Sequence, residues 1–423
     1  MKRRAGLAVA LVLMGCDGET SSPGVGSPHS AFDGDVAFLS DHTEIIVLSD
    51  ASSAQRVAVA PAWQGRVMTS TAGGPSGASY GWVNRPAIRR GIKPEDQREG
   101  LDRHIHVFGG EDRFWIGPEG GQFSWYFEPG AEFTFENWLV PAFIDTAPWE
   151  VARRSSAAVT FTHTATLENW SGRTFAIAVE REVRLLDKPA LSAALSFDLP
   201  ADVSFVAFES LNRLSNAGAE PWTTETGLPS VWILGMLIHG DETTVAIPYR
   251  KLEGEADEPI VKDDYFGKVP GDRLIVDEDD AQIYFTADGK YRSKIGIGPK
   301  RSLGAAGSWD ALRGVLTIVQ YNAPPEIEPY VNSQWALQDD PYRGDAINSY
   351  NDGPIEGGQL GPFYELETSS PALALGPGAS YEHIHRTIHF EGERDALDAI
   401  SRHVLGVSLG RIERRGGFEH QDK

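Results

Sequence analysis

The sequence predicts an all-β protein, a large antiparallel sandwich of two layers with a short helix near its carboxyl end. Runs of alternating apolar and polar residues dominate over helical periodicity. The 45 glycines and 26 prolines supply the turns that many short strands need. No repeat of solenoid or propeller period is present, and no Pro/Ser-rich linker divides residues 32–423. We therefore expect residues 32–423 to form one domain.

Four segments carry the clearest strand pattern, in which side chains at every second position share a face. They are residues 176–185 (AIAVEREVRL), 203–209 (VSFVAFE), 315–321 (VLTIVQY) and 382–390. One helix stands out at residues 393–405, where apolar residues recur at helical spacing. The charged stretch 251–264, which also contains Gly and Pro, is typical of an exposed loop.

The amino end has the layout of a secretory signal peptide. A positive segment (KRR, residues 2–4) precedes an apolar run over residues 5–14 that is too short to span a bilayer. The run ends in LMGC, which resembles a bacterial lipobox and implies cleavage before Cys16 and lipidation of its thiol. An ordinary signal peptide with an incidental cysteine is the alternative. We expect a lipoprotein signal peptide over residues 1–15 and a flexible Ser/Gly/Pro-rich tether over residues 16–31.

A lipidated Cys16 would hold the protein on a membrane of the bacterial cell envelope, facing the periplasm or the cell surface. Because Cys16 is the only cysteine, an intramolecular disulfide is excluded. The chain carries 60 acidic and 38 basic residues, a formal charge of −22, which repels nucleic acid. Neutral sugars are indifferent to this field, and polyanionic glycans would need a local basic cleft. We expect a carbohydrate ligand, no nucleic acid and no cofactor; the oligomeric state stays open.

Glu367 is the first candidate for chemistry. It lies in an apolar segment, YELETS, that has the composition of a buried strand. A carboxylate there is costly to desolvate unless it is paired, hydrogen-bonded or faces a wet cleft.

The stretch around Glu367 resembles the carboxyl-terminal part of galactose mutarotases (aldose 1-epimerases). In that family the catalytic base lies in a strand of the form apolar-Glu-Thr, followed by Pro, a Pro-Gly turn and a last strand. The matching elements here are Leu366-Glu367-Thr368, Pro371, Pro377-Gly378 and residues 386–390. The resemblance implies that Glu367 is a general base.

Most of the remaining chain resembles a bacterial family of mutarotase-like lipoproteins to which no reaction is assigned. The segments that carry this resemblance are HVFGGEDRFWIGPEGGQFSWYF, GKYRSKIGI and NSYNDGP. It implies a galactose mutarotase-like β-supersandwich, in which many antiparallel strands form two layers and a concave face holds a sugar.

The Gly- and aromatic-rich segment 109–127 has the composition of a sugar site. Glycines allow close approach of a ligand, aromatic rings suit the C–H face of a sugar, and charged groups hydrogen-bond its hydroxyls. The candidate substrate-binding residues are Glu111, Asp112, Arg113, Trp115 and Glu119. The alternative is a tight hairpin whose aromatics are core and whose charges cap turns.

The histidines depart from the mutarotase pattern. There, one histidine directly precedes the Gly pair, whereas Phe108 does so here, and His106 and His104 are the nearest candidates for a catalytic role. The histidine that acts as general acid has no counterpart in residues 209–216. Ring opening needs an acid as well as a base, so simple mutarotase activity requires another proton donor.

Two further rows of side chains have open interpretations. His383, His385 and His389 share one strand face and could hold a transition metal, but we expect a solvated outer face and no metal. Residues 290, 292 and 294 (Lys, Arg, Lys) alternate likewise and could bind an acidic sugar, although a cationic solvent-facing edge is commoner.

Asn351 and Asp352 lie in the turn-rich run GDAINSYNDGP. They either cap a loop or contact ligand hydroxyls or a cation, and both readings stay open. The first functional hypothesis is an epimerase-like or other glycan-processing enzyme with Glu367 as base. The second is a non-catalytic glycan-binding lipoprotein, and a third is an envelope scaffold.

Overall fold

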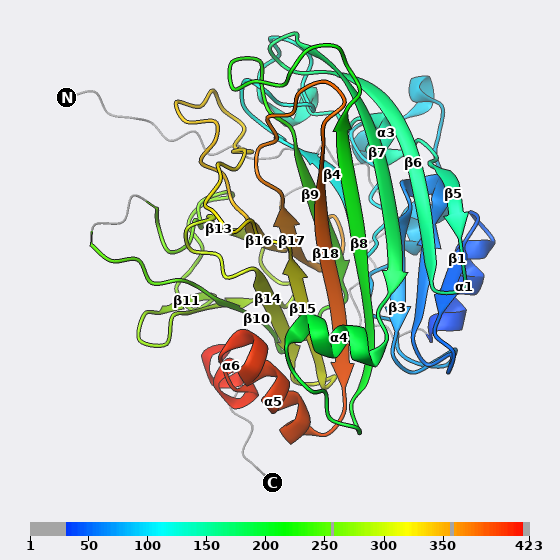
Figure 1. Ribbon diagram of the computed structural model, residues 1–423, viewed down its shortest axis with the longest axis vertical. Helices are drawn as coiled ribbons and strands as arrows, with labels where there is room; N and C mark the ends of the chain where they lie inside the picture. The colour runs from blue at the N-terminus through cyan, green and yellow to red at the C-terminus, as the bar shows by residue number, and fades with distance from the viewer. Residues whose placement is uncertain (1–30, 255–257, 356–358, 418–423) are drawn as a thin grey trace.

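The computed structural model describes residues 31–254, 258–355 and 359–417. Its strands form three antiparallel sheets, of ten, five and three strands, and two of the sheets pack face to face (Figure 1). The predicted all-β, two-layer antiparallel architecture is therefore confirmed. In the described part of the chain, no helix is both long and apolar enough to cross a membrane. The predicted signal peptide and Cys16 lie outside the described residues.

The ten-stranded sheet forms the larger layer. In spatial order its strands are β11 (Leu274–Asp277), β12 (Gln282–Thr286), β10 (Thr243–Pro248), β14 (Ala305–Asp310), β15 (Val315–Tyr321), β18 (Ser380–Glu391), β8 (Ser204–Asn216), β7 (Thr174–Leu185), β6 (Ala158–Glu168) and β5 (Glu150–Arg154). The four strands predicted from alternation are β7, β8, β15 and β18, which lie side by side in this sheet.

The five-stranded sheet forms the second layer and carries the predicted strand around Glu367. Its strands, in order, are β13 (Ser293–Ile297), β16 (Ile347–Asn351), β17 (Tyr364–Ser369), β9 (Ser230–Leu237) and β4 (Arg113–Gly117). One face, represented by Ile295 and Leu366, packs in a shared core with Val245 and Phe285 of the ten-stranded sheet. Side chains alternate along a strand, so the residues between them point to the opposite face.

A three-stranded sheet lies beside the two layers. Its strands are β1 (Ile46–Ser49), β2 (Arg56–Ala60) and β3 (Arg66–Thr71). A β-bridge between Val67 and Asp112 joins β3 to the residue before β4. The helix α1 (Phe32–Ser40) packs over this sheet through Leu39, which has no exposed surface (Figure 1).

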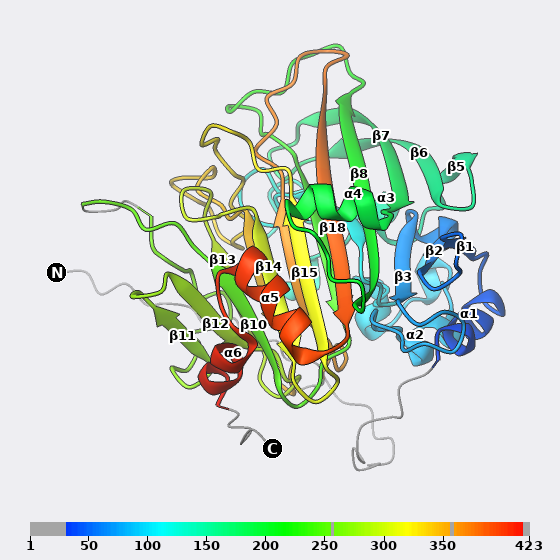
Figure 2. The ribbon, with the colours of Figure 1, turned by 60° about the horizontal axis from the view of Figure 1, so that its bottom comes forward.

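Helices cover the other face of the ten-stranded sheet. They are α4 (Lys188–Leu195), α5 (Arg394–Leu405) and α6 (Leu409–Arg415), and Figure 2 shows them lying across its central strands. Leu191 and Ile400 of these helices share a core with Ile388 and Phe390 of β18. The helix predicted at residues 393–405 is α5. Shorter helices lie in the connections: α2 (Arg85–Arg90), α3 (Ala142–Asp145), η1 (Pro61–Trp63), η2 (Glu95–Gln97), η3 (Gly100–Arg103) and η4 (Phe135–Asn137).

The histidine row of β18 is buried, contrary to the expected solvated face. His383 and His385 have no exposed surface and lie within hydrogen-bond distance of the Thr368 hydroxyl, at 2.9 and 2.8 Å. The expectation is wrong because the apolar face of β18 packs on α4 to α6. The histidine face therefore packs against the five-stranded sheet, where Thr368 lies. Burial lowers the pKa of His383 to about 3 and that of His385 to about 4, which keeps both rings neutral.

Candidate functional site

The outward face of the five-stranded sheet gathers a set of polar and aromatic side chains that we call the polar face. The strand register places these residues on the same side, because directly paired residues in antiparallel strands share a face. They are Lys294 of β13, Asn348 and Tyr350 of β16, Glu365 and Glu367 of β17, Trp232 of β9, and Arg113 and Trp115 of β4.

Glu367 is fully buried at the centre of this face, and both of its carboxylate oxygens are paired. The Lys294 ammonium donates to Oε1 at 3.0 Å and to Oε2 at 2.9 Å. Trp232 Nε1 donates to Oε2 at 2.9 Å. The carboxylate that was expected to need a partner therefore has two, Lys294 and Trp232.

A second ion pair lies beside the first. Arg113 Nη2 donates to Glu365 Oε1, and the Arg113 guanidinium lies 5.5 Å from the centre of the Trp115 ring. Burial raises the pKa of Glu365 to about 8, with Arg113 opposing and the neighbouring Glu367 adding to the rise. At pH 7 the protonated form of Glu365 therefore predominates, and the ion pair with Arg113 becomes complete as pH rises through about 8, while Glu367 faces the ammonium.

Glu119 approaches the same ammonium from a loop that follows β4. Its backbone N–H donates to Ser333 Oγ at 3.1 Å, which ties this loop to residues 331–338. At Gly120 an added Cβ would lie 2.4 Å from the Gln334 carbonyl oxygen, so only glycine permits this approach. The contact brings Trp335 to Glu119.

The charges of Glu119, Lys294 and Glu367 act on one another. Burial raises the pKa of the half-buried Glu119 to about 7, Lys294 lowers it and Glu367 raises it. Burial also lowers the pKa of Lys294, but Glu367 and Glu365 outweigh burial and leave it above its ordinary value. One ammonium is therefore surrounded by three carboxyl groups, two of which titrate near neutral pH.

Aromatic side chains cover the polar face. Trp115 stacks on Tyr126 with ring centres 5.4 Å apart and meets Trp232 edge-on at 5.8 Å. Trp138 stacks on Trp335 at 5.7 Å. Such flat apolar surfaces beside charged hydrogen-bonding groups suit the two kinds of surface on a sugar ring.

Glu111 and Asp112 do not lie on the polar face, although they adjoin Arg113 in sequence. Both are buried on the inner side of β4. His389 Nε2 lies 2.9 Å from Glu111 Oε2, and Arg181 forms an ion pair with Asp112. Glu111 lies in a bend, which allows it to share the inner side with Asp112, whereas the chain is extended from Asp112 onward, so that Arg113 faces outward where Asp112 faces inward.

His104 and His106 lie outside the polar face as well. His104 Nδ1 is 2.7 Å from the carbonyl oxygen of Trp138, so it supports the backbone under one of the covering indoles. His106 Nδ1 pairs with Asp145 Oδ2 at 2.7 Å. No hydrogen bond joins either ring to Glu367 in the described part of the chain.

Asn351 and Asp352 divide between the two faces. The Asn351 side chain lies on the inner side, where its Oδ1 accepts from Gly289 N–H at 2.9 Å. Asp352 accepts from the Tyr350 hydroxyl and from Gly361 N–H, which places it at the end of the polar face. The contact of Asn351 with Gly289 fits the interpretation in which this residue caps a loop.

The Gly109-Gly110 pair serves the packing of the chain itself. Gly109 has φ +91°, and an added Cβ would lie 2.1 Å from the Trp82 carbonyl oxygen. At Gly110 (φ +111°) the neighbour would be the Arg66 side chain at 2.6 Å. The close approach that suggested a ligand is made by protein atoms.

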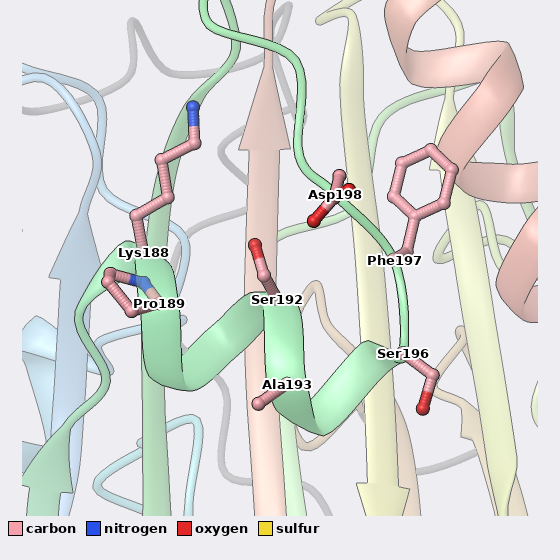
Figure 3. A pocket seen from close by; sticks show the side chains of 7 residues that line it. All are labelled: Lys188, Pro189, Ser192, Ala193, Ser196, Phe197 and Asp198. Atoms are coloured by element: carbon pink, nitrogen blue, oxygen red, sulfur yellow. The ribbon is translucent and has the colours of Figure 1, made fainter.

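A separate surface groove of about 630 Å³ lies beside α4 (Figure 3). Its lining residues are Lys188, Pro189, Ser192, Ala193, Ser196, Phe197 and Asp198, and none of them is buried. The groove belongs to the helix-covered side of the ten-stranded sheet, away from Glu367. It gathers no cluster of charged groups comparable to the polar face.

The raised pKa of Glu365 predicts a pH-dependent stability. The unfolded carboxyl titrates near its ordinary pKa of 4.5 and the folded one near 8, so the folded state holds the extra proton between these values. This contribution is complete below pH 4.5 and is lost as pH rises through 8. We expect Glu365→Gln, which keeps an acceptor for Arg113, to flatten this decline in urea unfolding. Parallel pH profiles for both proteins would contradict the assignment.

A comparison with known protein families assigns the chain to one of them. The profile of one family, described as "Family of unknown function (DUF6786)", matches residues 30–415. The chain belongs to the DUF6786 family. The matched span includes all three sheets and every residue of the polar face, so the site lies within the family domain. A search of curated proteins gave no match.

Among solved structures, this DUF6786 chain is similar to the Slr1438 protein from Synechocystis sp. PCC 6803, with 13% identity, TM-score 0.47, and 83% and 96% of the two chains covered. A galactose mutarotase-like protein from Lactobacillus casei has 11% identity, TM-score 0.46 and coverage of 82% and 100%. A galactose mutarotase related enzyme from Lactobacillus acidophilus has 10% identity, TM-score 0.41 and coverage of 82% and 98%. At these scores none of them transfers a reaction or ligand to this chain.

Proposed function

We propose that this protein binds carbohydrate on the polar face and acts on it by acid–base chemistry, with Glu367 as general base. One observation carries the proposal: the Lys294–Glu367 and Arg113–Glu365 pairs, the Glu119 carboxyl group and four indoles converge there from strands and loops distant in the sequence. A buried charge is costly, and a face that concentrates several of them needs a reason beyond stability.

The half-buried side chains mark where a ligand would enter. Glu119, Lys294 and Trp335 are each partly exposed, whereas Glu367 lies beneath them. A sugar would first meet the indole of Trp335 and the Lys294 ammonium. A ligand hydroxyl that takes over the Lys294 hydrogen bonds would then contact the Glu367 carboxylate, which is free to accept its proton.

Glu119 supplies the general acid, a role for which this sequence has no histidine at the expected position. A carboxyl group with a pKa near 7 is protonated in about half of the molecules at neutral pH, and such a group transfers protons efficiently. Glu119 and Glu367 act on the same ammonium, so a base and an acid are available at one place. Arg113, Trp115 and Glu365 complete the surface, and His104 supports Trp138 from behind.

The alternative is a non-catalytic glycan-binding or scaffold lipoprotein. The observation that favours it is the double hydrogen bond from Lys294 to Glu367, which occupies both oxygens of the proposed base. In this alternative Lys294 stays in place and the ligand contacts only the aromatic rim.

The envelope location is proposed from the amino-terminal pattern. Cleavage before Cys16 and lipidation of its thiol would place the domain at a bacterial membrane, facing the periplasm or the surface. Mass spectrometry of the purified protein tests this. A free amino terminus at residue 1, or an unmodified cysteine, would exclude the anchor.

Binding is tested with the full-length protein on a glycan array, and turnover by NMR of anomer interconversion or glycan cleavage. If Glu119 is the acid, kcat/KM falls as pH rises above about 7, because the required proton is lost. Glu119→Gln should remove this limb and lower the rate by about 10²-fold or more. Glu220→Gln, in the loop after β8, serves as the control. Absence of carbohydrate binding would contradict the proposed function.

A further inference from the structure

Arg292 is a cation without an acidic partner at the edge of the polar face. It directly precedes β13, two residues before Lys294, and is half-buried. Within the described part of the chain it forms no ion pair or hydrogen bond, and its buried Nε has no acceptor. Its guanidinium makes a cation–π contact with the Phe266 ring, whose centre lies 4.3 Å from the guanidinium carbon.

The other two cations of this row are satisfied. Lys290 is exposed and pairs with Asp241 at 3.0 Å, as in a cationic solvent-facing edge. Lys294 pairs with Glu367. The buried Nε of Arg292 has given up water without gaining an acceptor, and this is costly unless a ligand supplies one.

The surroundings of Arg292 connect it to the polar face. Phe266 meets Tyr350 edge-on with ring centres 5.9 Å apart, and Tyr350 lies on that face. The preceding residue, Tyr265, lies under the Lys294 ammonium, 5.8 Å from its ring centre. One loop therefore contacts both cations, which lie two residues apart in the chain.

The nearby carboxyl group of Asp352 does not take the place of a partner. Burial raises the pKa of Asp352, and the Tyr350 hydroxyl, the Gly361 N–H and Arg292 partly oppose that rise. Its oxygens accept from Tyr350 and Gly361 N–H, and no ion pair with Arg292 is formed. Arg292 therefore keeps its donors unpaired beside Phe266, a ring that is 50% exposed.

We propose that the carbohydrate is acidic and that Arg292 binds its anionic group, a carboxylate or a sulfate, while the sugar ring rests against Phe266. This inference rests on the proposed function and names the substrate class. A guanidinium matches a planar carboxylate with two parallel N–H bonds and also binds sulfate. The overall charge of −22 does not prevent this, because charges more than about 8 Å away are screened at physiological salt.

The test compares binding of uronic acid oligosaccharides, their methyl esters and sulfated oligosaccharides to the full-length protein by calorimetry. We expect the free acids or the sulfated sugars to bind and the neutral esters to bind at least about 10-fold more weakly. Arg292→Met should weaken binding of the acidic sugar about 10-fold to 100-fold. Lys290→Met, which removes the same charge two residues away, should change it less than about 3-fold.

The outcomes separate the two proposals. Selective loss with Arg292→Met supports the inference, and the better of the two acidic series identifies the anionic group. Binding of neutral glycans that is equal to that of acidic ones, or unchanged by Arg292→Met, overturns the acidic substrate but leaves carbohydrate binding intact. If no sugar of any charge binds, the proposed function fails and the inference fails with it.

Discussion

Replacing Glu367 by glutamine is expected to lower the rate of sugar turnover by about 10²-fold or more, because the amide cannot accept a proton as the carboxylate does. The change is nearly isosteric, and Trp232 Nε1 can still donate to the amide oxygen. Lys294 loses its anionic partner and becomes easier to displace. Ground-state binding of the sugar should therefore be kept or strengthened while turnover is lost. NMR of the reacting sugar, together with calorimetric binding, measures both effects.

A matched control is Glu382→Gln in β18, a partly exposed glutamate that pairs with Arg213 outside the polar face. It makes the same chemical change and should leave turnover unaltered. If Glu367→Gln and the parent protein turn over substrate equally while both are folded, Glu367 is not the base. If neither shows turnover but both bind, the non-catalytic alternative gains support.

Replacing Arg181 by methionine is expected to destabilise the protein by about 3–5 kcal/mol, since it leaves a buried charge without its partner. Arg181 of β7 and Asp112 before β4 both have no exposed surface. Arg181 also donates to the carbonyl oxygen of Gly65 and to Asn212. It therefore connects the ten-stranded sheet, the segment before β3 and the segment before β4. Urea unfolding of the two proteins measures the loss.

The comparison for this stability prediction is Arg153→Met. Arg153 and Glu180 form an exposed pair at 3.8 Å, with side chains 65% and 41% exposed, and surface pairs contribute about 0–1 kcal/mol. Equal destabilisation by both substitutions would show that the buried pair is not what holds the three segments together. If Arg181→Met does not fold at all, Arg181→Lys, which keeps the charge, should recover part of the stability.

The fold was predictable where one face of a strand differs from the other. In β7 buried and half-buried positions alternate, so its period of two is visible in the sequence. Every residue of β9 is buried, and a strand with two interior faces lacks this alternation. Strand β18 is also buried on both faces, and for this reason its histidines were wrongly expected to be solvated. Helix α4 left a weaker signal in the sequence, which consists of the capping residue Asp187 and the proline that follows in the first turn.

Part of the site was predictable because it breaks a local rule. Glu367 stands out as a charge in an apolar strand, and Glu365, two residues earlier, shares its face for the same periodic reason. Their partners were not predictable. Lys294 and Trp232 are 73 and 135 residues from Glu367, and the register of distant strands is not written in local sequence. The roles expected of Glu111 and Asp112 depended on that same missing register.

The position of β17 in the middle of its sheet has a consequence for biosynthesis. This strand is bordered by β9 and β16, so the chain from Arg113 to Glu367 must be complete before the five strands can close. Such long-range pairing forms slowly, because the entropy of large loops is lost before the contacts are gained. A nascent chain released before residue 369 would lack the strand that holds Glu365 and Glu367. The carbohydrate binding that we propose would consequently require a chain that extends through β17.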